Sequence, residues 1–223
     1  MSRRACQVMG GVMALGALAT VGAGTAHVHF HALDVQDARL RSIDMQHQND
    51  ARFEKELQEA MRQHPADYHL PQLGGIRAYH TKQGNPLPLL ARSLYLYPGS
   101  AVSHLYVGRT LARAGRLDQA LVEYMVTVRR RPRLVPMVAD EVIRLTDGFQ
   151  QARKWARLPG DRLLVYEALA EAYLRAHRPD EARRADVAAL SVDPEAPGPL
   201  KRAIRRHMDA EMWSEARKLA LRL

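Results

Sequence analysis

The chain has 223 residues, of which 47% are hydrophobic and 26% charged, a length that suits one compact domain or a short array of helical hairpins. Aromatic residues, at 6%, are too sparse for a typical β-sandwich or barrel, and the single cysteine, Cys6, excludes an intramolecular disulfide and a cysteine-based metal cluster. The formal net charge of +9 comes mostly from arginine, which GC-rich coding also supplies, so basicity alone does not indicate nucleic-acid binding.

Residues 1–31 have the pattern of a targeting segment. Arg3 and Arg4 precede twenty-two residues without charge, Ala5 to Ala26. As a helix this stretch would be about 33 Å long, enough to cross a hydrocarbon core of about 30 Å, and the preceding arginines favour a cytoplasmic N-terminus. It also ends Gly24-Thr25-Ala26, which suits cleavage. We expect either a single-pass inner-membrane anchor with the remainder in the periplasm, or a secreted chain cut after Ala26.

Three alternating histidines, His27, His29 and His31, follow the apolar stretch. If cleavage leaves His27 as the first residue, its amine, two amides and the imidazole of His29 could bind one Cu(II) or Ni(II) in a square plane. A juxtamembrane segment that happens to be rich in histidine explains the same pattern. No other histidine has metal-ligand spacing, so we expect no metal and no cofactor.

Residues 32–64 are predicted to be a linker followed by one helix. Phe53, Leu57 and Ala60 recur at helical spacing before Pro65. The domain that follows, residues 65–223, begins with an irregular helical hairpin in which Leu70 and Leu73 fit the first helix. The stiff run from Gly84 to Pro88 then predicts the turn before the second helix.

A repeat of 34 residues is the strongest signal in the chain. It runs from Pro98 to Pro132, since 132 − 98 = 34. Gly108 is predicted to let the first helix of this unit approach the second, and Gly115 to turn the chain between them. Small and large packing residues of the second helix, Ala120 and Tyr124, complete the pattern.

A second unit in the same register ends at Pro194, with its predicted helices at 162–176 and 179–191. Its packing residues are Ala170, Tyr173, Ala182 and Ala189. A third unit keeps the spacing with Leu200, Ile204, Trp213 and Ala216, and we expect Ser214 to cap its last helix. Residues 133–159 form a shortened unit that turns at Asp147-Gly148-Phe149. Trp155 and Trp213 are predicted to be core anchors.

These motifs resemble the tetratricopeptide repeat family over roughly residues 48–223. The resemblance implies an all-α fold, a right-handed solenoid of about four and a half helical hairpins after the N-terminal anchor helix. In this family a partner binds along the concave face, which the first helix of each hairpin lines. By register, that face would carry Leu105, Arg109, Arg113, Glu167, Glu171, Arg175, Lys201 and Arg205.

The function predicted from this resemblance is a non-catalytic scaffold that binds a protein or peptide, with acidic side chains suited to the basic bias of the face. The cations Arg129 to Arg131 are expected at a helix end outside that face. No nucleophile elbow, phosphate loop or dinucleotide fingerprint occurs in the sequence, so we expect no enzyme activity. Nucleic acid is not an expected partner, although a basic repeat protein that binds it is a third reading.

A weaker resemblance, around Pro65 to Tyr68 and the hairpins after it, is to the repeat tails of bacterial O-antigen ligase or polymerase-like membrane proteins. It implies an alternative function as an accessory subunit or tail of a cell-envelope polysaccharide-assembly system. In that family the chemistry belongs to a membrane domain with many spans.

Overall fold

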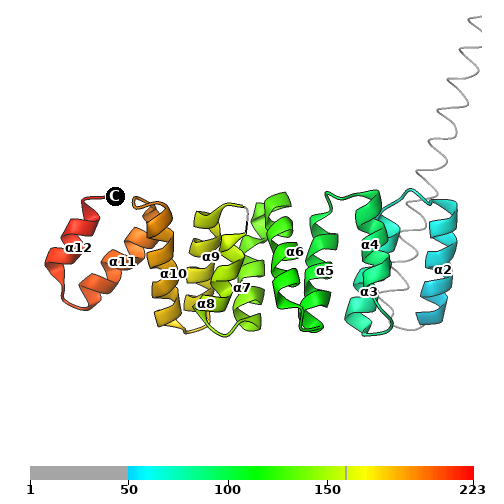
Figure 1. Ribbon diagram of the computed structural model, residues 1–223, viewed down its shortest axis with the longest axis horizontal. Coiled ribbons are helices and arrows are strands. Elements are labelled where there is room, and N and C mark those ends of the chain that lie inside the picture. The colour runs from blue at the N-terminus through cyan, green and yellow to red at the C-terminus, as the bar shows by residue number, and fades with distance from the viewer. Residues whose placement is uncertain (1–49, 159) are drawn as a thin grey trace, which may run out of the picture. The chain divides into compact units, whose positions relative to one another are not determined.

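The computed structural model describes residues 50–158 and 160–223 (Figure 1). These residues form eleven α-helices and one short 3-10 helix, without any strand, which confirms the all-α class. About four and a half hairpins would supply only about nine helices, so the prediction undercounted them. The predicted anchor at 1–31, Cys6 and the three alternating histidines lie outside the described residues.

Contacts divide the chain into two units, Met1–Gly74 and Gly75–Leu223. The first unit includes α2 (Asp50–Gln63) and the start of α3 (His69–Thr81). The helices that follow α3 are α4 (Leu87–Leu96), α5 (Ala101–Arg113), α6 (Leu117–Arg130), η1 (Pro132–Leu134), α7 (Val135–Leu145), α8 (Phe149–Arg157), α9 (Arg162–Arg175), α10 (Pro179–Val192), α11 (Pro197–Asp209) and α12 (Trp213–Ala220).

The core of the first unit forms where α2 meets the start of α3. Phe53, Leu57 and Ala60 lie on one face of α2 because residues three and four apart share a helix face. Together with Leu70 they make a buried apolar cluster. The predicted single helix before Pro65 is therefore present. No helix among residues 50–158 and 160–223 is long and apolar enough to span a membrane.

In the second unit, Gly108 permits the close approach of α5 and α6. A Cβ atom placed on it would lie 2.8 Å from two ring carbons of Tyr124, which is closer than real side chains come. Ala120, near the start of α6, is fully buried. The small residue at 108 and the large residue at 124 thus contact each other as the sequence predicts.

Three inter-helix turns of the second unit have the same backbone conformation. Gly115, His177 and Glu211 occupy the left-handed region with φ of 75°, 56° and 57°, and the last two are 211 − 177 = 34 residues apart. In each turn the next residue donates its N–H to the carbonyl five residues before it, as in Arg116 to Leu111 at 2.9 Å. This arrangement satisfies carbonyl groups that a helix end leaves unpaired. The equivalent bonds join Arg178 to Tyr173 at 2.9 Å and Met212 to His207 at 2.8 Å.

The shortened unit packs differently from the complete ones. Although Gly148, with φ of 81°, turns the chain between α7 and α8 as predicted, α7 packs mainly against α9. The short helix α8 places Trp155 in the core, where it is fully buried. The loss of residues in this unit therefore lets α7 and α9 become close neighbours.

Two predictions for the last helix are wrong. Trp213 is 61% exposed, because α12 buries only Ala216. Ser214 lies inside α12 instead of capping it, since the helix begins at Trp213 and its N-cap is Met212. The residue types at 213 to 216 matched the repeat, but α12 packs mainly against α11, which leaves its outer side in solvent.

Candidate functional site

A surface hollow of about 420 Å³ lies in the second unit, over α5 and its neighbours. Side chains from α3, α5, α6 and α7 line it. We call it the α5–α7 hollow, and its residues are Tyr79, His80, Arg109, Ala112, Arg113, Tyr124, Glu141, Arg144 and Leu145.

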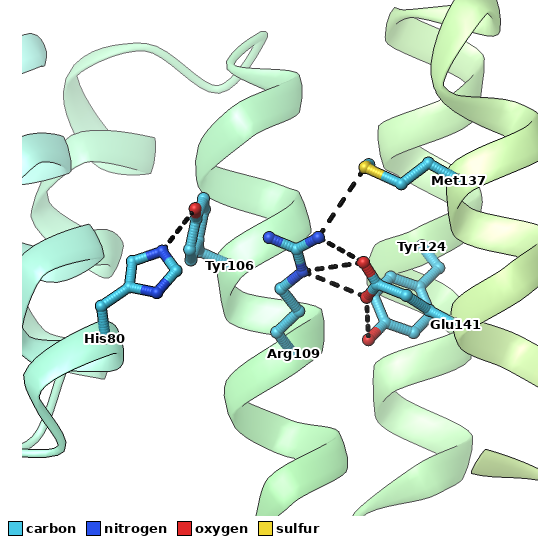
Figure 2. Close-up of polar contacts among 6 residues, drawn as sticks. All are labelled: His80, Tyr106, Arg109, Tyr124, Met137 and Glu141. Atoms are coloured by element: carbon cyan, nitrogen blue, oxygen red, sulfur yellow. Dashed lines mark hydrogen bonds and ion pairs between the residues drawn. The ribbon is translucent and has the colours of Figure 1, made fainter. Parts of the chain in front are cut away.

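An ion pair between α5 and α7 forms part of this lining (Figure 2). The Arg109 Nε donates to both carboxylate oxygens of Glu141, at 3.0 and 3.1 Å, and a second guanidinium nitrogen also bonds this carboxylate. The hydroxyl of Tyr124 on α6 donates to Glu141 Oε2 at 3.2 Å. The network thus links three helices, and it neutralises the one carboxylate that lines the hollow.

Burial and electrostatics raise the pKa values of both Tyr124 and Arg109. Burial, then the charge and hydrogen bond of Glu141, raises the pKa of Tyr124, so its phenol stays protonated. Burial by itself would lower the pKa of Arg109, but the hydrogen bond and charge of Glu141 outweigh it and raise that pKa. Arg109 therefore stays charged and paired.

Aromatic side chains flank the ion pair. The Tyr79 and Tyr106 rings are nearly perpendicular, with centroids 5.4 Å apart, and the His80 Nε2 lies 2.9 Å from the Tyr106 hydroxyl oxygen (Figure 2). Arg113 stacks with its Cζ 3.8 Å from the Tyr79 ring centroid and donates from Nη1 to the Tyr79 carbonyl at 2.9 Å. This stacking orients the guanidinium while leaving donors unused.

The hollow carries an uncompensated positive charge. Arg109 is matched by Glu141, whereas Arg113 and Arg144 are exposed and make no ion pair with the described residues. The guanidiniums of Arg113 and Arg144 can bind a carboxylate by charge-assisted hydrogen bonds. The aromatic rings beside them can contact the apolar part of the side chain that carries this carboxylate.

The predicted site residues are distributed over several places. Only Arg109 and Arg113 line the hollow. Leu105 is a core residue, 5% exposed, and offers a partner little surface. Arg175 bonds Asp140 of α7 at 2.8 Å. Lys201 and Arg205 are exposed on α11 without an ion pair to the described residues.

The two predicted acids lie on α9, beside α11. Glu171 is 3.6 Å from Arg202. Glu167 lies so close to Gly198 that a Cβ there would approach its Oε1 to 2.7 Å, and burial raises its pKa. Both carboxylates thus lie near α11, and neither lines the α5–α7 hollow.

Sequence reasoning missed the residues that α3 and α7 contribute to the hollow: Tyr79, His80, Glu141, Arg144 and Leu145. Both helices belong to irregular units, to which the 34-residue register assigns no inward positions. A signal was nevertheless available, because the strongly amphipathic segment at 135–145 carries adjacent acids, Asp140 and Glu141, that can pair with arginines of neighbouring helices.

Comparison with protein-family models and with curated proteins yields no match. Within residues 50–158 and 160–223, no group of three or more histidine, cysteine, aspartate or glutamate side chains is placed to hold a metal ion.

Proposed function

We propose that this protein is a non-catalytic scaffold whose helical hairpins are repeats of the tetratricopeptide type, stacked as a right-handed solenoid. It holds a protein or peptide partner in the α5–α7 hollow, and residues 1–31 carry or tether it across a membrane. The identical turns at Gly115, His177 and Glu211 support the repeat assignment, because local sequence similarity alone does not require the same backbone hydrogen bonds.

The observation that supports the binding proposal best is the unpaired positive charge of the hollow. Arg113 and Arg144 have no ion pair within the described residues, while the only carboxylate of the lining is occupied by Arg109. An acidic side chain or the terminal carboxylate of a peptide would form ion pairs with these two guanidiniums. The rings of Tyr79 and His80 supply apolar surface beside them.

Not every cation predicted to bind the partner is available to it. Arg109 and Arg175 are engaged by Glu141 and Asp140, so their role is to join neighbouring helices. Arg113 and Arg144 remain for the partner near α5 and α7. A longer partner could continue to Lys201 and Arg205 on α11, which are also exposed.

The test is affinity capture by the full chain in intact membranes, followed by binding measurements with the identified partner. The double variant Arg113→Glu/Arg144→Glu should weaken binding by about 2 kcal/mol or more, since it removes charge-assisted bonds and adds repulsion. The control is Arg129→Glu/Arg131→Glu at the end of α6, where exposed charges are screened. Circular dichroism must show that both variants are folded.

Two results would count against the proposal. Equal loss in both double variants would indicate a diffuse anionic ligand, such as lipid headgroups or nucleic acid, instead of a peptide in the hollow. Unchanged binding in Arg113→Glu/Arg144→Glu would show that the partner binds elsewhere.

A further inference from the structure

A second hollow, of about 550 Å³, lies among α8, α9 and α10. We call it the α8–α10 hollow. It shares no lining residue with the α5–α7 hollow. Its volume is within the range of small-molecule sites.

Three arginines line this hollow: Arg153 from α8, and Arg183 and Arg184 from α10. None of them makes an ion pair with the described residues, although many other arginines of the chain do. Asp180 is the one acid in the lining. The hollow therefore has a formal charge of +2, three arginines less one carboxylate.

Arg153 is the most constrained of the three. Its Nε is buried and has no hydrogen-bond acceptor among the described residues. Because the Nε is covered by protein, an oxyanion in the hollow would bond the other nitrogens of the Arg153 guanidinium. The planar guanidinium also matches the geometry of phosphate and carboxylate oxygens.

Besides Gln150 and Ser191, the remaining lining consists of apolar and aromatic residues. The rings of Phe149 and Tyr166 lie with centroids 6.2 Å apart, and both side chains are almost fully buried. Val187 of α10 also lines the hollow, although 61% of its surface is exposed. A ligand with an apolar body would cover this valine and remove its apolar surface from water.

We propose that the α8–α10 hollow binds an organic phosphate, with its oxyanion among Arg153, Arg183 and Arg184 and its apolar body against the exposed side chain of Val187. Three guanidiniums opposed by one carboxylate match the double charge of a phosphate monoester better than the single charge of a carboxylate. The site is independent of the peptide-binding proposal, because it uses other helices.

The experiment titrates the full chain with 1-naphthyl phosphate and measures binding by calorimetry. Inorganic phosphate, 1-naphthol and 1-naphthoate are the comparison ligands. We expect saturable binding of 1-naphthyl phosphate, tighter by about 10-fold or more than that of any comparison ligand. Equal affinity for inorganic phosphate or for 1-naphthoate, or no saturable binding of 1-naphthyl phosphate, would overturn the proposal.

Substitutions in the lining test whether its charged residues bind the phosphate or only support the fold. Arg153→Gln and Arg184→Gln should each weaken binding by about 10-fold, and Asp180→Asn should tighten it several-fold because it removes a repelling charge. Arg217→Gln, an exposed arginine on α12 outside both hollows, is the matched control and should leave affinity unchanged. If Asp180→Asn fails to tighten binding while the variant is folded, the oxyanion does not lie in this hollow.

Discussion

Gly108 of α5 contacts the ring of Tyr124 of α6 so closely that no side chain fits between them: an added Cβ would lie 2.8 Å from the ring. The contact fixes how near the two helices lie. It also determines where Tyr124 stands beside Glu141, and hence the network that lines the α5–α7 hollow.

Gly108→Leu should destabilise the protein by about 1–3 kcal/mol, because overpacking forces α5 away from α6. Ala120→Trp, at a fully buried position, should do the same. The measurement is thermal or denaturant unfolding of the full chain, with Ala91→Leu on the exposed side of α4 as control. Unchanged unfolding of both core variants would show that the helix contact at 108 is wrong.

His177 and Glu211 hold the left-handed conformation that Gly115 holds in the equivalent turn. Because side chains with a Cβ disfavour that conformation, His177→Gly and Glu211→Gly should each raise stability, by about 1 kcal/mol or less. The matched control is Ala176→Gly, one residue before His177, where φ is −84°. It should lower stability, because glycine relieves no strain at that φ and only increases the conformational entropy of the unfolded chain. Chemical denaturation compares the three. Loss of stability in both turn variants would contradict the left-handed assignment.

Reversing the charge at Arg109 should destabilise the folded protein more than reversing the charge at Arg113. Arg109→Glu would place two carboxylates together beside a buried tyrosine and cost about 2 kcal/mol or more. Arg113→Glu loses an exposed stacking contact and an exposed hydrogen bond to the Tyr79 carbonyl, together worth about 1 kcal/mol. Unfolding curves of the two single variants test this. Equal destabilisation would mean that the Arg109–Glu141 pair contributes no more than a surface contact.

His104 on α5 contributes a pH-dependent contact with Glu123 on α6, through its Nδ1 at 2.6 Å. Burial lowers the pKa of His104, but the hydrogen bonds to Glu123 and to the Pro98 carbonyl, with the charge of Glu123, outweigh it, so the net pKa is raised. A raised pKa in the folded state stabilises the protein below the unfolded value of about 6.5, and that stability is lost as pH rises through the folded pKa.

The free energy of unfolding should therefore fall between about pH 6 and pH 8 by more in the native chain than in His104→Gln. Urea denaturation at several pH values in this interval measures the difference. The same pH slope in both proteins would show that His104 does not titrate with the fold.

Residues 32–223 should reach the far side of a membrane, since Arg3 and Arg4 precede the apolar stretch. A reporter that is active only after export, fused to the C-terminus, should be active. N-terminal sequencing would then separate an intact anchor from a chain cut after Ala26. A reporter active only when kept in the cytoplasm would contradict this topology.

Local sequence patterns determined much of the helical framework. Small residues at 108 and 120, glycines at 115 and 148, and prolines after helices limit what the backbone can do, and these constraints act within one or two turns of chain. They therefore predicted the hairpins around Gly115 and His177, and in the second of these the helix ends fall within about a residue of the expected ones.

Only the tertiary structure decided which charges pair with each other and which stay exposed without an ion pair. Arg109 and Arg113 look equivalent in the sequence, four residues apart on one helix face, but α7 brings Glu141 to the first and leaves the second over Tyr79. A carboxylate 32 residues away cannot be assigned to one arginine by periodicity, because the choice depends on how α7, the first helix of the shortened unit, packs. The α8–α10 hollow likewise depends on how α8 packs against α9 and α10, and no repeat register distinguishes its arginines from solvated surface residues.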